Sequence, residues 1–548
     1  MKKWQILGTD DKDIIAVLLK NRGLKTKKEI NDFLHPYSPD LPNPPDVGID
    51  SNQLHKAIKR IKKAIEKKES VVVYADYDAD GITAGAIMWE TLHKLGADVM
   101  PYIPHRVEEG YGLSIKGIDT VREKYNATLI VTVDHGITAW EKVKYAQSLG
   151  IDVIVTDHHV KPNKLPDCLI VHTTGISGAG VSWFVAKTLI GSGLGRERPD
   201  PARDELLALC AIGTIADMMP LVGPNRSIVK YGLEAINKTN RVGLVALISD
   251  AGLAKGSLET YEVSHMIAPR LNAMGRIEHA LDALRLLCTG RKDKAAVLAQ
   301  TLGLKNRERQ QLTMDTTVHA LQGVALQRQG HPLRKLIFVV HESYNQGVIG
   351  LVAGKLVEEY YLPAIVVSKG EVYSKASARS IAGFNIVEAI RSASDILVDV
   401  GGHPMAAGFT VETKNLASLQ DRLEKLAAKE LSEDKLTRVL RIDAEIPLEM
   451  VTEELWQKLR AFEPFGFGNP EPTFATKRVK VAEARLVGAE GKHLKVKIDG
   501  LEAIAFNFGK LYGKLQPDAS IDIAYTISMD TWNGNRRLQL KIKDIHIY

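Results

Sequence analysis

Three aspartates at alternate positions, directly after a short apolar run, constrain this chain more than any other stretch. Val71 to Tyr74 is an apolar run rich in β-branched residues, which is typical of a strand buried on both faces. Asp76, Asp78 and Asp80 follow, and a helix is predicted from Ile82 to Leu95. The three acids therefore lie where a strand passes into a helix, which is where α/β sheets place their ligands.

Carboxylates this close together destabilise one another, because each raises the pKa of its neighbours. A divalent cation removes the repulsion, and hard cations prefer carboxylate oxygens. The alternative is a solvated turn in which Asp80 caps the following helix and no metal binds. Taken alone, this stretch favours the turn, whereas the rest of the chain favours the metal.

Further short apolar runs follow, most of them separated by helical patterns. They span residues 99–103, 129–136, 151–159 and 168–172. This alternation predicts a doubly wound, mostly parallel α/β sheet. Parallel strands share one carboxyl edge, so Asp134-His135 and Asp157-His158-His159 should converge on the edge that bears the first three aspartates.

Another acid, Asp217, follows an apolar segment. Each of these residues alone has a simpler interpretation, because an aspartate there is usually a turn residue and a histidine a local hydrogen bonder. Together, three strand ends of one sheet that carry such residues favour a metal site. The mostly carboxylate set suits Mn²⁺ or Mg²⁺ better than structural zinc, and it has enough ligands for two ions bridged by a shared carboxylate, as in phosphoryl hydrolysis.

Length and composition set the class of protein. The 548 residues are too many for one core, so about three domains are expected. The net charge of +6 indicates no global basic field, so nucleic acid would bind in a local cleft. The cysteines Cys168, Cys210 and Cys288 are scattered and odd in number, which favours reduced thiols. No stretch resembles a signal peptide or a membrane span, so we expect a cytoplasmic protein without membrane contacts.

The regions on either side of this sheet have other patterns. Residues 1–50 carry a helical stretch and a passage with five prolines, which forbid regular structure, and we expect an arm that lies on the next domain. A long helical pattern from residue 284 to about 328 should connect two domains. A second α/β unit follows, and short alternating strands from about residue 438 predict a small β-barrel.

Ordered motifs along the chain resemble those of one family. DYDADG (76–81), VDHG (133–136), DHH (157–159) and ADMMPL (216–221) are similar to the four motifs of the DHH phosphoesterase superfamily. Later stretches resemble the RecJ family of single-strand-specific 5′→3′ exonucleases: IAPRLNAMGRIEHA (267–280), LKNRERQQ (304–311), GVIGLVAGKL (347–356), SARSIAGFNIVEAI (377–390), GGHPMAAGF (401–409) and EPFGFGNPEP (463–472).

The resemblance implies an organisation for the whole chain. A DHH-type parallel-sheet domain, a long connecting helix, a DHHA1 α/β domain and a C-terminal OB-fold β-barrel are expected. The corresponding boundaries are an N-terminal arm (1–50), a DHH catalytic domain (51–265), a connecting helical region (266–330), a DHHA1 substrate-binding domain (331–435) and an OB-fold nucleic-acid-binding domain (436–548).

The resemblance also implies two divalent cations, Mn²⁺ or Mg²⁺. One would be held by Asp76, Asp78 and Asp134, and the other by Asp80, Asp134, His158 and Asp217, with Asp134 as the bridge. Which of the first three aspartates binds which ion stays open. His159 and His135 would steady the phosphate or the leaving oxygen, and Asp157 would orient a ligating histidine.

Contacts to nucleic acid or phosphate are expected from basic and aromatic residues outside the metal site. They are Arg270 and Arg276 after the catalytic domain, Arg379 and His403 in the DHHA1 domain, and Lys492, Trp532 and Arg536 in the barrel. The alternative for the first two arginines is a surface salt bridge, and for the barrel residues it is ordinary packing or surface.

The function implied is a metal-dependent 5′→3′ exonuclease that degrades single-stranded DNA to 5′-mononucleotides in recombination and repair. By resemblance it acts as a monomer with a single-strand-binding protein and a RecQ-type helicase as partners. One alternative is a DHH phosphodiesterase of short oligoribonucleotides or cyclic dinucleotides, which usually lacks the barrel. Another is a non-catalytic replication scaffold, which would have lost acids that this chain retains.

Overall fold

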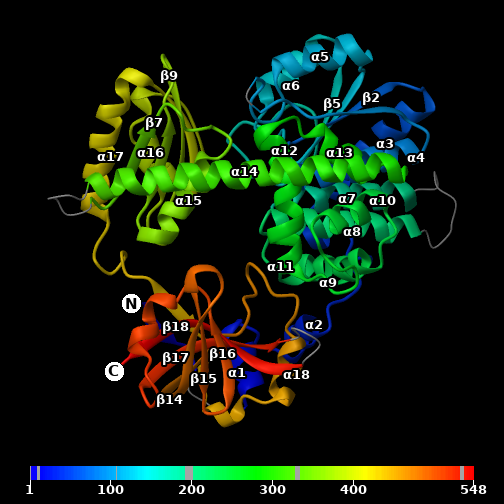
Figure 1. Cartoon of the computed structure of the whole chain (residues 1–548). Coiled ribbons are helices and arrows are strands. Elements are labelled where there is room, and N and C mark those ends of the chain that lie inside the picture. Colours follow the sequence, from blue (N-terminus) through cyan, green and yellow to red (C-terminus); the bar gives the residue numbers. More distant parts are fainter. Residues whose placement is uncertain (1, 9–12, 107, 192–200, 328–333, 531–535) are drawn as a thin grey trace. The chain divides into compact units, whose positions relative to one another are not determined.

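The computed structural model describes residues 2–8, 13–106, 108–191, 201–327, 334–530 and 536–548 (Figure 1). These form two compact units. The larger unit consists of Ile6–Asn306 and Ile442–Tyr548, and the smaller one of Met1–Gln5 and Arg307–Arg441. Helix α14 (Lys292–Gln327) is one continuous helix whose first part belongs to the larger unit and whose second part belongs to the smaller one.

A five-stranded parallel sheet lies at the centre of the larger unit, as the alternation of apolar runs predicts. The strand order is β3-β2-β4-β5-β6, with bounds Asp98–Tyr102, Ser70–Ala75, Leu129–Val133, Asp152–Asp157 and Leu169–His172. Every neighbouring pair is parallel. All five carboxyl ends therefore lie at one edge.

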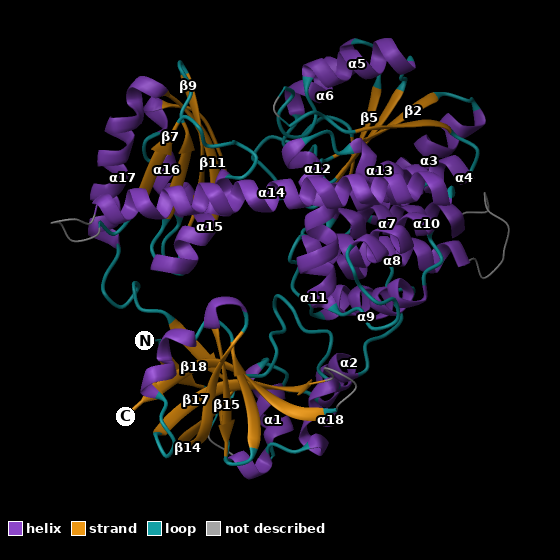
Figure 2. Cartoon of the chain, viewed as in Figure 1, coloured by secondary structure: helices purple, strands orange, loops and turns teal. Residues whose placement is uncertain are grey.

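Both faces of this sheet are buried, because alternate side chains of each strand point to opposite sides. On β2, Val71 and Val73 join one hydrophobic core, and Val72 and Tyr74 join another. Helices α3 (Ser51–Glu66), α4 (Ala79–Lys94) and α7 (Gly178–Leu189) cover the first face, and α5 (Ile115–Tyr125) and α6 (Trp140–Ser148) cover the second (Figure 2).

Helix α4 begins earlier than the sequence predicts. It starts at Ala79 instead of Ile82, and Asp78 is its N-cap, with a side-chain oxygen that accepts a hydrogen bond from the Gly81 N–H at 3.0 Å. The suggestion that Asp80 caps this helix is therefore wrong. Asp80 lies in the first turn instead, where its carboxylate turns toward the next helical layer.

That helical layer follows the sheet in the sequence and packs onto α4. Its helices are α8 (Pro201–Ala216), α9 (Gly223–Lys238), α10 (Val242–Asp250), α11 (Thr260–Glu262), α12 (Ala268–Ile277) and α13 (Leu281–Cys288). A π-helical turn over Val263–Ile267 joins α11 to α12. Within the described ranges, no helix is both long and apolar enough to cross a bilayer.

The C-terminal part of the larger unit is the predicted barrel. Its strands are β14 (Phe474–Val487), β15 (His493–Ile498), β16 (Leu501–Ala505), β17 (Ser520–Asp530) and β18 (Arg537–Ile547). The order β14-β15-β16-β18-β17 closes through a β14–β17 pairing, and short β13 (Ala444–Glu445) adds to β14. Helix α18 (Glu453–Arg460) lies between β13 and β14 in the sequence.

The N-terminal arm differs from its prediction. It contains β1 (Lys3–Ile6), α1 (Ile14–Asn21) and α2 (Lys27–Leu34), and the proline-rich passage forms a 3₁₀ turn over Pro44–Val47. Leu18 and Phe33 belong to the hydrophobic core of the barrel, not to the surface of the parallel-sheet domain. The rest of the arm lies on the domain that follows, as predicted: Arg226 donates to the Phe33 carbonyl at 2.8 Å, the Tyr231 hydroxyl donates to the Pro36 carbonyl at 2.9 Å, and Val47 joins the core of that domain. The prediction missed the contact with the barrel because the barrel follows more than 400 residues later.

The smaller unit is built on a mixed five-stranded sheet. Its order is β10-β11-β9-β8-β7, with bounds Leu397–His403, Ala406–Glu412, Tyr373–Arg379, Ala364–Ser368 and Ile337–His341. The β7–β8 pair is parallel and the other pairs are antiparallel. Helices α15 (Ile349–Tyr360), α16 (Ile386–Arg391) and α17 (Leu416–Glu430) pack with it, which agrees with the predicted second α/β unit.

We predict that Leu18→Ala destabilises the barrel, because Leu18 is 0% exposed in a core that the arm and the barrel share. Removing such a side chain costs about 2–5 kcal/mol of unfolding free energy. Leu41→Ala is the control, since Leu41 is 70% exposed. Chemical denaturation of both variants measures the difference, and equal midpoints would contradict the shared core.

Candidate metal centre

The carboxyl edge of the parallel sheet gathers acids and histidines from three neighbouring strands. Asp76 follows β2, Asp134 follows β4, and His158 follows β5. Asp134 has a left-handed backbone with φ of 66°, a conformation that non-glycine residues seldom adopt and that often occurs at functional sites.

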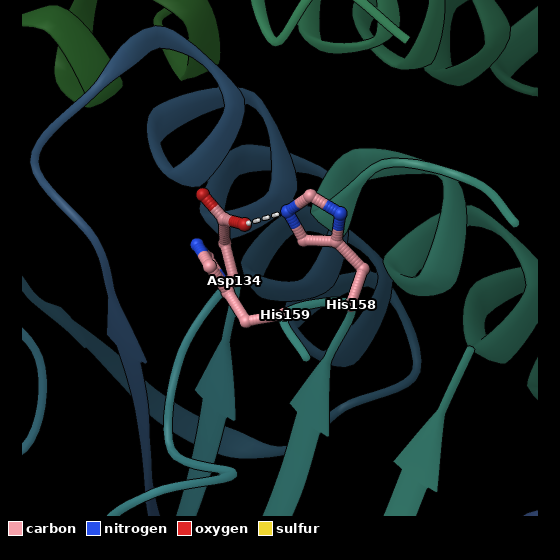
Figure 3. Close-up of side chains that lie close together, drawn as sticks. All are labelled: Asp134, His158 and His159. Carbon is pink, nitrogen blue, oxygen red and sulfur yellow. Dashed lines mark ion pairs between the residues drawn. The ribbon is translucent and has the colours of Figure 1, made fainter. Parts of the chain in front are cut away.

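His158 lies at the centre of the cluster. Its Nε2 is 3.1 Å from Asp134 Oδ1, 3.8 Å from Asp80 Oδ2 and 3.7 Å from Asp217 Oδ2. Figure 3 shows the imidazole and the Asp134 carboxylate pointing toward each other from adjacent strand ends. One imidazole nitrogen thus lies close enough to three carboxylates for these groups to bind the same cation.

Three overlapping groups of side chains have ligand atoms within 4.8 Å of one another among the described residues. They are Asp76, Asp78 and Asp134; Asp80, His158 and Asp217; and Asp134, His158 and His159. The first two groups correspond to the two ligand sets that the resemblance implies. Asp134 lies between them, since it belongs to the first group and contacts His158 of the second.

Two glycines allow this close approach. A Cβ on Gly178 would lie 2.4 Å from Asp134 Oδ1, and one on Gly213 would lie 2.4 Å from Asp80 Oδ1. The N–H groups of Gly178 and Ala179 donate to the two oxygens of Asp80, at 2.7 and 2.9 Å. The N-terminus of α7 therefore fixes Asp80 with its side chain facing the cluster.

Crowding raises the pKa values of these acids. Burial is the larger cause and a neighbouring carboxylate the second: Asp78 acts on Asp76 and Asp80, and Asp80 acts on Asp134 and Asp217. The pKa of Asp80 rises to about 6 and that of Asp217 to about 8. A positive charge among these carboxylates would offset their mutual repulsion.

The unsatisfied atoms of the cluster fit a divalent cation. Asp76 Oδ1 is buried and has no hydrogen-bond partner within the described chain. A neutral imidazole nitrogen and a carboxylate oxygen that face each other at 3.1 Å repel unless a proton or a metal ion lies between them. The donors are oxygens with one imidazole, which suits Mn²⁺ or Mg²⁺.

His159 is oriented by Asp157 and by a residue that the sequence analysis missed. Its Nδ1 lies 2.8 Å from Asp157 Oδ1, and its Nε2 lies 3.2 Å from the Tyr111 hydroxyl. That hydroxyl also donates to the Asp134 carbonyl at 3.3 Å. Burial lowers the pKa of His159, but the hydrogen bond to Asp157 outweighs it and the pKa rises to about 9. Asp157 thus orients the His159 ring, and the same carboxylate oxygen accepts a hydrogen bond from the His158 backbone N–H at 2.7 Å.

His135 lies outside the cluster of acids around His158. Its Nε2 lies 2.9 Å from the Tyr74 carbonyl, and its ring packs edge-on against the Tyr74 ring. Burial lowers its pKa to about 4, so the imidazole is neutral. After the left-handed turn at Asp134 the side chain points back toward β2, which the sequence pattern does not reveal.

Asn272 is a second residue that the sequence analysis missed. Its side-chain oxygen accepts from the Ala79 N–H at 2.8 Å, and nearby Gly275 lets α12 approach, since a Cβ there would lie 2.4 Å from the Tyr77 carbonyl. Helix α12 therefore braces the loop that carries Asp76 and Asp78. The PRLNAMGR stretch was singled out only for its arginines.

Models of three domains match this chain: the DHH family, N-terminal domain, over residues 70–214; the DHHA1 domain over 334–429; and the RecJ OB domain over 442–544. The single-stranded-DNA-specific exonuclease RecJ of Bacillus subtilis is 38% identical over 547 residues, which cover 97% of this chain and 67% of that protein. This chain belongs to the RecJ family. The RecJ of Salmonella typhimurium is 31% identical and covers 98% of this chain and 96% of its own length.

The fold is that of solved RecJ structures. The crystal structure of RecJ in complex with Mn²⁺ from Thermus thermophilus matches with a TM-score of 0.84 at 31% identity, over 100% of this chain and 80% of that one. The complex of that RecJ with Mg²⁺ matches with a TM-score of 0.79. The expected DHH, DHHA1 and OB-fold architecture is therefore confirmed.

In this RecJ-family chain, Arg270 is engaged elsewhere. Its guanidinium pairs with Asp250 at 3.3 Å and donates to the Met266 carbonyl at 2.8 Å, which matches the salt-bridge alternative. Arg276, also on α12, is near enough to Tyr77 to lower its pKa slightly against a larger rise from burial. Arg276 thus lies beside the loop that carries the first aspartates.

The two DHHA1 residues lie in one row of the smaller sheet. Arg379 ends β9 and His403 ends β10, and each pairs in register with Ala406 of the intervening β11. Their side chains therefore point to the same face, two strands apart. A Cβ on Gly350, in the first turn of α15, would lie 3.1 Å from a guanidinium nitrogen of Arg379. Arg379 thus lies beside the N-terminus of α15, a favourable position for phosphate.

Among the described residues, the predicted contact residues of the barrel do not lie in one cluster. Lys492 is exposed after the turn that precedes β15. Arg536 pairs with Glu453 at 2.8 Å and lies over the Trp456 ring, which matches the surface alternative. Trp532 lies outside the described residues.

We predict that Gly178→Ala weakens Mn²⁺ binding by about 10-fold or more, because the new methyl group would displace the Asp134 carboxylate. Gly323→Ala in α14 is the control, since its Cβ would meet nothing within 4 Å. Isothermal titration with MnCl₂ measures both variants. Equal affinities would mean that Asp134 takes no part in binding the metal.

Proposed function

We propose that this protein is a metal-dependent exonuclease that degrades single-stranded DNA from the 5′ end to 5′-mononucleotides. The buried cluster of carboxylates around His158 carries the proposal, because two cations held in such a cluster can activate water and stabilise the phosphate during phosphodiester hydrolysis. Family membership supports the substrate, since its RecJ relatives are named single-stranded-DNA-specific exonucleases.

Two cations, Mn²⁺ or Mg²⁺, would be held by the two ligand groups. Asp76, Asp78 and Asp134 form one, and Asp80, Asp134, His158 and Asp217 the other, with Asp134 shared. When bound, such a pair lowers the pKa of a water ligand and neutralises charge on the scissile phosphate.

The chain's own residues supply orientation and protons. His159, with a pKa of about 9 and its Nδ1 held by Asp157, is a cation at neutral pH whose positive charge can stabilise a phosphate oxygen beside the cluster. The Tyr111 hydroxyl keeps the imidazole facing the cluster. Arg379 binds a phosphate of the terminal nucleotide beside the α15 N-terminus, and His403 contacts the same nucleotide from the same face of the sheet.

The barrel holds the rest of the strand. OB-folds bind single strands through basic grooves and stacking aromatics, and Lys492 is the best-placed of the proposed contacts. The same family membership supports a cytoplasmic monomer that works in recombination and repair, with a single-strand-binding protein and a RecQ-type helicase as partners.

A gel assay tests the proposal directly. Single-stranded DNA, duplex DNA and RNA of one sequence, each 5′-labelled, are incubated with and without Mn²⁺. We expect release of labelled mononucleotide from single-stranded DNA alone, and only with the metal. Preference for RNA dinucleotides would favour the oligoribonuclease alternative, and no cleavage at all the scaffold.

We predict that Asp134→Ala abolishes this cleavage and leaves binding of single-stranded DNA largely intact, because Asp134 is the ligand that the two proposed cations would share. Asp98→Ala, at an exposed position of β3, is the control. Turnover and fluorescence anisotropy are measured with Mn²⁺ present. Full activity of the Asp134 variant would remove the mechanism.

We also predict that Arg379→Ala raises KM for 5′-phosphorylated strands by roughly 10- to 100-fold, since a hydrogen bond to a charged group is worth roughly 1.5–3 kcal/mol. Arg391→Ala, which removes an exposed guanidinium of the same unit, should leave KM unchanged. A KM for unphosphorylated strands that rises as much would show that Arg379 does not bind the terminal phosphate.

A further inference from the structure

The EPFGFGNPEP motif has no part in the chemistry described so far. It lies in a turn between α18 and β14, which we call the 461–470 turn after its residues. Phe462 of this turn lies in the core of the barrel and Arg22 of the arm donates to Asn469, but the turn also contacts the catalytic domain. Those contacts come from two directions.

The first direction is α9. Arg226 is 1% exposed and donates to four successive carbonyls of the turn: Ala461 at 3.3 Å, Phe462 at 3.0 Å, Glu463 at 2.7 Å and Pro464 at 3.4 Å. It also donates to the Phe33 carbonyl at 2.8 Å and lies over the Phe33 ring. A buried guanidinium is tolerated only when its donors are satisfied, so the turn and the arm are fixed to α9.

The second direction is the segment that follows Asp217. The Leu221 N–H donates to the Phe467 carbonyl at 2.7 Å. A Cβ on Gly468 would lie 2.9 Å from Pro220 Cβ, and the Thr260 hydroxyl donates to the Phe465 carbonyl at 2.6 Å. The turn therefore packs against residues 220 and 221 at van der Waals distance.

Asp217 lies at the C-terminal end of α8, next to the segment that the turn contacts. Helix α8 ends at Ala216, and the backbone at Met218 is left-handed, with φ of 55°. The Asp217 side chain is 31% exposed, against 2% for Asp80 and Asp134. Asp80 is held by the α7 N-terminus, whereas the Asp217 N–H donates to the Gly213 carbonyl at the end of α8, and the chain then continues into the segment that the turn contacts.

We propose that the 461–470 turn is a positioning element for Asp217. It touches neither substrate nor metal. It holds residues 220 and 221, and through them the end of α8 that presents Asp217 to the ligand group of Asp80, His158 and Asp217. The inference rests on the metal centre of the proposed function. It means that the barrel side of the chain supports hydrolysis even of strands too short to reach the barrel.

The test uses Gly468→Ala in the full chain. Gly468 has φ of 75°, and the added methyl group would press on Pro220. Gly500→Ala is the matched control, because Gly500 has φ of 88° in the same barrel and its Cβ would meet nothing within 4 Å. Both variants bear the same left-handed strain, so a difference between them reports the contact with Pro220.

Three measurements are made on each variant: titration with MnCl₂ without DNA, hydrogen exchange of residues 217–222, and kcat on a tetranucleotide. In Gly468→Ala we expect one Mn²⁺ site weakened by about 10-fold or more, faster exchange of the Leu221 amide and a lower kcat. Gly500→Ala should match the wild type in all three.

A double-mutant cycle with Asp217→Asn separates positioning from general damage. If the turn acts through Asp217, Gly468→Ala has no further effect on Mn²⁺ binding in the Asp217→Asn background. An effect of the same size in both backgrounds, or Gly468→Ala binding Mn²⁺ as Gly500→Ala does, would overturn the proposal.

A second variant tests whether the effect of Gly468→Ala comes only from misfolding. Arg226→Lys keeps the charge, but an ammonium cannot reach four carbonyls in a row, so we expect the same weakened site, with thermal unfolding followed in parallel. The proposed function fails on a different result: wild type and Gly500→Ala would then bind two Mn²⁺ ions and cleave no single-stranded DNA.

Discussion

Repulsion among buried carboxylates is the constraint on which the rest of this structure depends. Asp76, Asp80 and Asp134 are almost fully buried at one sheet edge, and their pKa values are raised first by burial and then by one another. Carboxylates buried this close together are stable only when they are protonated or when a cation lies among them, and the proposed cation pair supplies that positive charge. The parallel sheet brings the acids together at one edge, and the helical layer buries them.

The segments that surround the acidic cluster come from parts of the chain that are far apart in the sequence. The α7 N-terminus holds Asp80, and α12 braces the loop before α4 through Asn272. The 461–470 turn bonds Leu221, a few residues after Asp217. The N-terminal arm joins this arrangement, because Phe33 packs on Arg226 and Leu18 lies in the core of the barrel. In the larger unit, catalytic domain, arm and barrel are therefore joined through buried contacts.

The sequence predicted most of this architecture, because buried parallel strands have an unmistakable pattern. The runs at β2, β4 and β5 located the sheet, and the rule that parallel strands share a carboxyl edge brought Asp134 and His158 to the first aspartates. Periodicity could not predict contacts that arise from tertiary approach. Tyr111 reaches His159 across a loop, and His135 turns away after a left-handed residue.

The central claim is that two cations share the Asp134 carboxylate. Crystals of the protein soaked in MnCl₂ and measured at the manganese absorption edge test it most directly. The account predicts two anomalous peaks about 3.5–4 Å apart, with the Asp134 carboxylate between them and His158 on one of them. A single peak, or peaks away from Asp134, would contradict it.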